Sequence, residues 1–391
     1  MRTSSTSAAT VRRAASAAAV TGAVAGAALG TGWYYSSVLL DPRSRAGFPE
    51  RVLATTAGSV VLARSRLCAQ PGVWGLRWDG GLAVLGPVLE QEGDRVVRQR
   101  REGPRPPVGP AVIDAGPFDP DPAARGLAFA EVAVQTPLGP APAWDVRAPE
   151  RGGADGVCAE GVWAIHVHGR GGSRREALRI LPALHRLGLR QLVISYRNDD
   201  TAPDGPDRRC HLGDTEWQDL DAAVGYALER GAEKIVLVGW SMGAAVSGAF
   251  LDRSPRAAHV AAVVWDAPLL DWHATLRSQA ANRYLPPALA GLASRFTTCR
   301  IGIDFDRFDL VRRPPAVRPP TLLVHSDADS AVPVSVSREL AAAAPGLDWP
   351  VRYLEVAGVE HTGSWNADPQ AYSDAVTGFL GETLGIGGRD R

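Results

Sequence analysis

The sequence has no surplus of either charge. Its 391 residues include 42 basic and 42 acidic side chains, and no long run carries a single sign. Binding to nucleic acid depends on basic side chains that neutralise many phosphates. The composition therefore predicts no nucleic-acid partner.

Cysteine is also scarce. The four cysteines, Cys68, Cys158, Cys210 and Cys299, lie far apart, and none belongs to a Cys-x-x-Cys pair. This spacing excludes a thiol-rich zinc site and a thioredoxin-type redox pair. We expect neither a cofactor nor a metal.

Charge is absent from residues 14–40, a stretch of 27 residues, whereas about 20 apolar residues suffice to cross a bilayer. Three arginines precede it, and the positive-inside rule then keeps that flank in the cytoplasm. We therefore expect residues 1–41 to be a membrane anchor, with the catalytic domain outside the cytoplasm. A cleaved signal peptide and a soluble tail are alternatives.

Two further regions follow. In residues 42–126, short apolar runs separated by glycine and proline favour a small β-rich module that ends in a proline-rich linker. In residues 127–391, apolar strands alternate with helical patterns, which predicts a mostly parallel sheet flanked by helices. Residues 271–318 exceed the length of an ordinary connection and predict a cap over the site. The predicted strands are Val162–Val167, Gln191–Ser195, Lys234–Val238, Val260–Trp265, Thr321–Val324 and Val351–Val356.

One strand pattern, KIVLV, runs into Gly239-Trp240-Ser241-Met242-Gly243 and then into a helical pattern. This is the strand-turn-helix setting of a G-x-S-x-G nucleophile elbow. A Cβ at either glycine would clash with neighbouring backbone, while the serine stands exposed on a strained turn. We predict that Ser241 is a nucleophile, with an ordinary glycine turn as the alternative.

A second motif, HVHGRGGS at residues 166–173, places a glycine-rich loop after another apolar strand. The backbone N–H groups of Arg170 and Met242 could together form an oxyanion hole. His166 and His168 could instead be metal ligands, but no further ligand follows them and Arg170 adds a fixed positive charge. We therefore predict an oxyanion loop at this position.

The later strand patterns supply an acid and a base. His361 follows the last predicted strand in a glycine-containing loop, ahead of a final helix. The candidate acids are Asp327 and Asp329 in HSDADSAVP, and Asp266 one strand after the serine. A neutral serine becomes a good nucleophile only when an imidazole takes its proton and a carboxylate orients that imidazole. These residue types complete such a set.

Together, the elbow, the glycine loop, H-S-D-A-D-x-x-V-P and G-V-E-H resemble α/β-hydrolases over residues 127–391. The chain resembles membrane-anchored serine hydrolases of the Bem46 and abhydrolase-domain type, and more distantly the prolyl oligopeptidase-type peptidases. This resemblance implies the α/β-hydrolase fold and assigns the acid to Asp329, four residues before Pro333. HGRGG stands where many lipases have HGGG, and residues 42–126 match no family pattern.

We therefore expect a serine hydrolase that cleaves carboxylic or thio esters through an acyl-enzyme intermediate, with a small ester or lipid-like substrate. Esters are favoured because their leaving groups need less protonation than amines. A serine peptidase, whose substrates the β-rich module would screen, is the alternative. A non-catalytic scaffold is the third possibility.

Overall fold

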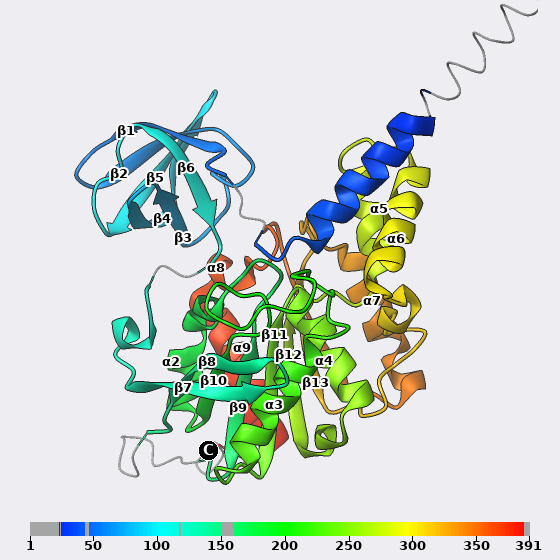
Figure 1. The fold of residues 1–391 in the computed structure, drawn as a ribbon. Coiled ribbons are helices and arrows are strands. Elements are labelled where there is room, and N and C mark those ends of the chain that lie inside the picture. The colour runs from blue at the N-terminus through cyan, green and yellow to red at the C-terminus, as the bar shows by residue number, and fades with distance from the viewer. Residues whose placement is uncertain (1–22, 24, 44–46, 117–118, 150–158, 387–391) are drawn as a thin grey trace, which may run out of the picture.

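The computed structural model describes residues 23, 25–43, 47–116, 119–149 and 159–386. In this part of the chain, a β-barrel and a group of helices stand over one edge of a larger α/β domain (Figure 1). The candidate site lies at that edge.

The β-rich module is a closed barrel, with strands in the order β1-β2-β5-β4-β3-β6. Its interior holds apolar side chains such as Val52, Leu62 and Leu76. Arg98 is also fully buried, and its guanidinium donates to backbone carbonyls, including those of Gln70 and Gly86. The barrel strands are Glu50–Thr55 (β1), Ser59–Ala63 (β2), Trp74–Trp78 (β3), Gly81–Glu92 (β4), Arg95–Glu102 (β5) and Gly109–Asp114 (β6).

The α/β domain contains an eight-stranded sheet in the order β14-β13-β12-β11-β9-β10-β8-β7. The strands from β10 to β14 in this order are parallel, whereas β8 pairs antiparallel with β10 and β7. The strands are Phe129–Thr136 (β7), Gly139–Val146 (β8), Val162–Val167 (β9), Arg190–Ile194 (β10), Lys234–Trp240 (β11), Val260–Asp266 (β12), Thr321–Ser326 (β13) and Val351–Val356 (β14). The mostly parallel sheet predicted from the sequence is thus present, with all six predicted strands in it.

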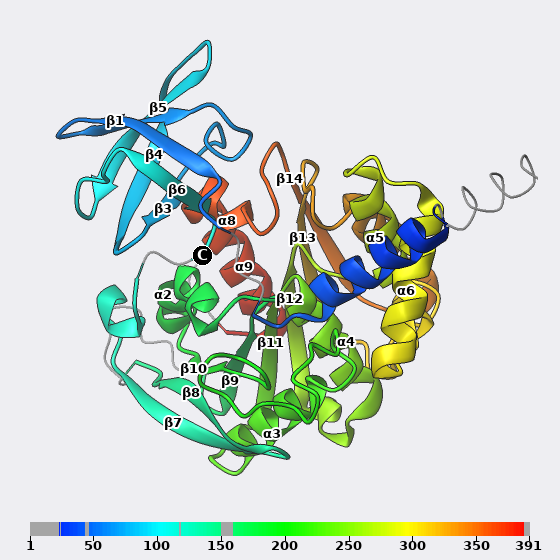
Figure 2. The same cartoon turned by 45° about the horizontal axis from the view of Figure 1, so that its top comes forward.

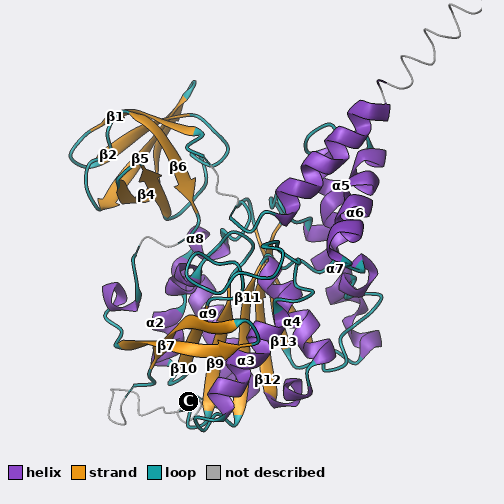
Figure 3. Ribbon diagram, viewed as in Figure 1, coloured by secondary structure: helices purple, strands orange, loops and turns teal. Residues whose placement is uncertain are grey.

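Helices cover both faces of this sheet (Figure 3). On one face, the core joins the sheet to Trp217–Leu228 (α3), Met242–Arg253 (α4) and Val334–Ala343 (α7). On the other, it joins the sheet to Leu181–Arg186 (α2) and Pro369–Leu384 (α9). Since both faces are covered, the central strands are largely apolar, and in β9 every residue is buried.

The predicted cap region contains two helices, Trp272–Ala281 (α5) and Pro287–Ile301 (α6). Residues 25–40 form a further helix, α1, which is drawn in blue and lies beside α6 (Figure 2). Leu40, at its end, is buried in the core of the α/β domain. The helices of this group therefore come from two segments that are far apart in the sequence.

The structure does not support the prediction that residues 1–41 are a membrane anchor. No helix in the described part of the chain is long and apolar enough to cross a bilayer. Within α1, Ser36 is fully buried and bonds to Thr297 of α6. An uncharged segment suits a protein surface as well as a lipid one, so the sequence pattern did not separate the two. Residues 1–22 and 24 of the predicted anchor lie outside the described residues, and the location of the domain outside the cytoplasm stays a prediction.

Candidate active site

Ser241 sits in the turn between β11 and α4, with a φ of 52° and a ψ of −117°. Such positive φ values strain a residue with a side chain and are found at functional turns. A Cβ on Gly243 would lie 2.1 Å from the carbonyl oxygen of Val167, and one on Gly239 would lie 3.0 Å from the Gly243 backbone. The tight turn predicted around Ser241 is therefore present, and glycine alone fits at position 243 beside the end of β9.

Three of the predicted residues meet at this edge of the sheet. Ser241 Oγ lies 2.8 Å from His361 Nε2, and His361 Nδ1 lies 2.6 Å from Asp329 Oδ2. The Asp329 side chain has no solvent exposure, whereas the His361 side chain is 24% exposed. The order of contacts is the one in which a carboxylate orients an imidazole and the imidazole accepts the serine proton.

Asp329 is held by four hydrogen bonds. Its Oδ1 accepts from the N–H groups of Ala331 and Val332 at 2.7 and 2.8 Å, and its Oδ2 also lies 3.1 Å from His325 Nε2. Burial would raise the Asp329 pKa, but the charge of His361 and the hydrogen bonds from both histidines outweigh burial and lower it. Burial would likewise lower the His361 pKa, but Asp329 outweighs it and raises the pKa above its usual value. The pair is thus built to stabilise an imidazolium.

The other two candidate acids lie elsewhere. Asp327 Oδ1 accepts from the N–H of Gly358 at 2.7 Å and so closes a loop. Asp266 is buried, and its Oδ1 accepts from the Ser364 hydroxyl at 2.9 Å. Among the described contacts, neither carboxylate has a hydrogen bond to His361, so Asp329 is the candidate whose position fits.

The predicted oxyanion loop passes directly beside the serine. A Cβ on Gly169 would lie 3.1 Å from Ser241 Cβ. The loop is fixed from behind, because the Gly169 N–H donates to Glu176 Oε2 at 2.8 Å and the Tyr196 hydroxyl donates to the Gly169 carbonyl at 3.1 Å. Arg170, the next residue, lines the same pocket as Ser241 and Met242. A rigid loop of this kind can present an amide to an oxyanion at little reorganisation cost.

The two histidines of this motif, His166 and His168, have separate environments. His166 Nε2 lies 3.1 Å from Gln191 Oε1, and burial lowers the His166 pKa to about 4. His168 stacks on Tyr196 and lies 2.8 Å from Asp199 Oδ2. No group of three or more His, Cys, Asp or Glu side chains in the described ranges is placed to hold a metal ion. The metal-ligand interpretation of this motif has no support in this geometry.

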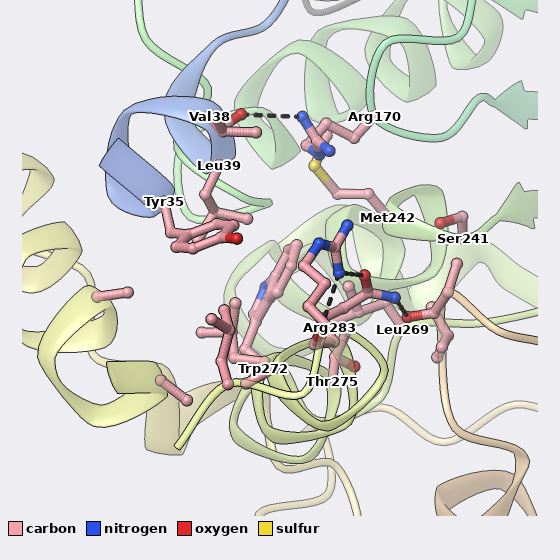
Figure 4. Close-up of a pocket in the computed structure, with 18 of the residues that line it drawn as sticks. Tyr35, Val38, Leu39, Arg170, Ser241, Met242, Leu269, Trp272, Thr275 and Arg283 are labelled. Atoms are coloured by element: carbon pink, nitrogen blue, oxygen red, sulfur yellow. Dashed lines mark hydrogen bonds between the residues drawn. The ribbon is translucent and has the colours of Figure 1, made fainter. Parts of the chain in front are cut away.

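A pocket of about 280 Å³ opens from Ser241 and His361 (Figure 4). Its walls come mainly from α1, α5 and α6, through apolar side chains such as Leu39, Leu276 and Leu289. Arg170 and Arg283 also line it, and no acidic side chain from the described residues does. The pocket therefore suits an apolar group.

The barrel supports the loops that carry His361 and Asp329, a feature that the sequence analysis missed. Gln70 Oε1 accepts from the N–H of Glu360 at 2.9 Å, and Arg66 pairs with the Glu360 carboxylate. Glu360 in turn accepts from the Ser330 hydroxyl at 2.8 Å. These contacts join residues about 290 positions apart, and no local pattern could have revealed them.

Two family models match the chain. Residues 208–387 match the prolyl oligopeptidase family, and residues 51–113 match a domain of unknown function, DUF8805. The second match falls on the barrel. "Uncharacterized protein Rv2307c" of Mycobacterium tuberculosis is 29% identical over 232 residues, which cover 58% of this chain and 72% of that protein.

Solved structures share the architecture. An esterase of Pyrococcus furiosus, Pf2001, superimposes with a TM-score of 0.52 and 18% identity, over 68% of this chain and 97% of the esterase. A puromycin-hydrolyzing peptidase of Mycobacterium tuberculosis has a TM-score of 0.53 and 19% identity, over 82% of this chain and 55% of the peptidase. At these identities, the likeness shows the fold.

The α/β-hydrolase fold predicted for residues 127–391 is thus confirmed. With the family match, it supports a serine hydrolase, and it leaves esterase and peptidase unresolved. The predicted likeness to membrane-anchored Bem46-type hydrolases is not shown by these matches. The structure therefore belongs to the α/β-hydrolase fold.

Proposed function

We propose that the chain is a serine esterase that acts on carboxylic esters with an apolar acyl group. Ser241 is the nucleophile, His361 the general base and Asp329 the acid that orients it. The observation that carries this proposal is the pair of contacts at 2.8 and 2.6 Å that join these three side chains at the mouth of an apolar pocket.

In the first half-reaction, Ser241 Oγ attacks the ester carbonyl carbon while His361 Nε2 takes the hydroxyl proton. The N–H groups of Arg170 and Met242 stabilise the oxyanion, since Met242 begins α4 and its N–H has no partner within the helix. His361 then protonates the departing alcohol, which leaves the acyl-enzyme. In the second half-reaction, His361 activates a water molecule that releases the acid and restores Ser241.

The walls of the pocket favour an ester over a peptide. A peptide brings a backbone N–H and C=O at every residue, and each costs free energy when buried without a partner. The lining is largely aliphatic, with side chains such as Leu269, Leu276 and Ala293. An acyl chain needs no such partners, and burying it is favourable by about 0.8 kcal/mol per methylene.

A serine peptidase is the second candidate, favoured by the match of residues 208–387 to the prolyl oligopeptidase family. A polar crevice of about 610 Å³ between the barrel and the α/β domain also has room for a peptide. It is lined by charged side chains, among them Arg77, Arg174 and Asp199. Under this alternative, the barrel would select substrates.

A fluorophosphonate probe, together with matched substrates, tests the proposal. Each acyl group is offered as a p-nitrophenyl ester and as a p-nitroanilide. We expect labelling and ester turnover in the natural chain and in Ser59→Ala, a serine of the barrel. Both should be lost in Ser241→Ala, whose fold should remain intact. Preference for peptidyl anilides would favour the peptidase, and labelling of Ser241→Ala would remove Ser241 as nucleophile.

A further inference from the structure

Helix α1 borders the pocket and also packs against α6. Tyr35, Val38 and Leu39, at positions i, i+3 and i+4, lie on one face and line the pocket that opens from Ser241 (Figure 4). Leu39 is half-buried, and Val38 is 37% exposed at the edge of the helix. The last two turns of α1 are therefore a wall of the candidate active site.

The same helix is also fastened to α6. A Cβ on Gly32 would lie 2.8 Å from Leu292 Cγ, so the two helices approach closely at this glycine. Thr297 donates to the buried Ser36 hydroxyl at 3.0 Å, and Arg300 donates to the Ser37 hydroxyl at 3.0 Å. Buried hydrogen bonds of this kind fix one register of the two helices.

Three contacts link the end of α1 to residues of the proposed catalytic machinery. The N–H of Cys210 donates to the Leu40 carbonyl at 2.9 Å, and Cys210 Sγ lies 3.5 Å from Met242 Sδ. The Arg170 guanidinium also reaches the Val38 carbonyl at 3.4 Å. The wall is thus anchored to both residues of the proposed oxyanion hole.

We propose that the end of α1 determines the length of acyl chain that the esterase accepts, with Leu39 and Val38 as the specificity-determining side chains. This inference rests on the esterase function proposed above. The pocket volume of about 280 Å³ equals roughly nine water molecules at about 30 Å³ each. An acyl chain of medium length fills such a space between α1, α5 and α6.

A tryptophan scan along α1 tests this inference with p-nitrophenyl acetate and p-nitrophenyl octanoate. Leu39→Trp fills the pocket, so the ratio of octanoate to acetate kcat/KM should fall at least about tenfold, the factor lost when two methylene groups are excluded. Val38→Trp should lower the same ratio, and its position at the exposed edge protects folding. Leu29→Trp is the matched control, because Leu29 is 51% exposed on the same helix and does not line the pocket.

Thermal melting and fluorophosphonate labelling of each variant show whether it is folded and whether Ser241 reacts. If Leu39→Trp unfolds, Val38→Trp decides the question. Folded, labelled variants whose ester ratio equals that of Leu29→Trp would overturn the inference and leave the esterase function standing. If the natural chain cleaves neither ester, or if Ser241→Ala still does, the proposed function itself fails and the inference with it.

Discussion

Replacing Asp329 with asparagine should separate the role of this side chain in orienting His361 from its role in packing. Asparagine has nearly the same shape, so its carbonyl oxygen can keep the hydrogen bonds from the N–H groups of Ala331 and Val332. Its NH₂ group then replaces Oδ2, the atom that faces His361 Nδ1 at 2.6 Å and His325 Nε2 at 3.1 Å. A donor now stands where both imidazoles meet an acceptor.

The consequence for catalysis follows from the imidazole tautomer. Facing a donor, His361 Nδ1 becomes an acceptor and the proton moves to Nε2, where it blocks transfer from Ser241. The comparable change in a well-studied triad lowers turnover by about 10⁴-fold, which corresponds to about 5.4 kcal/mol at 1.36 kcal/mol per decade. We expect a loss of at least about 10²-fold for Asp329→Asn.

The assay is kcat for one activated ester, with Asp327→Asn and Asp266→Asn as matched controls. Each control should lose less than about tenfold, because neither carboxylate bonds to His361 in the described contacts. Thermal melting confirms that all three variants are folded. If Asp266→Asn were inactive and Asp329→Asn active, the assignment of the acid would be refuted, while the roles of Ser241 and His361 would stand.

Other changes test the remaining features. As the general base, His361 must be neutral, and its pKa is raised above the usual 6.5. We therefore expect kcat/KM to rise with pH through a midpoint above 6.5. A midpoint below 6.5 would exclude His361 as the titrating group. Gly243→Ala places a methyl group 2.1 Å from the Val167 carbonyl oxygen, so it should lower the melting temperature and abolish fluorophosphonate labelling. The control Gly291→Ala has open space around its Cβ, and its melting temperature should be unchanged or slightly higher. Gln70→Ala removes the acceptor of the Glu360 N–H and should lower kcat, by up to about 10²-fold, more than it changes KM; equal effects on KM would argue against a positioning role for the barrel.

The sequence alone determined the features that depend on local geometry. The strands Val162–Val167 and Val351–Val356 were predicted with the bounds that the structure shows, because both are rich in strand-forming side chains and have turn residues at their ends. The turn around Ser241 was also evident from local sequence, since Gly243 is required by the approach of α4 to β9 and Gly239 by the approach of β11 to α4. Chain order alone then brought His361 to the same edge, because the ends of parallel strands converge there.

The tertiary structure decided every feature that depends on a distant partner. An uncharged helix at residues 25–40 is compatible with a bilayer or with another helix. The close approach of Gly32 to Leu292 and the hydrogen bond between Ser36 and Thr297 show that it packs on α6. The choice among three nearby carboxylates required distances, because Asp327 and Asp329 differ by two positions in one loop but only Asp329 reaches His361. A hydrophobic pattern shows that a segment will be buried, but it does not identify the surface against which the segment packs. For that reason the sequence specified the catalytic edge of the sheet, while only the folded chain revealed which helices enclose its pocket.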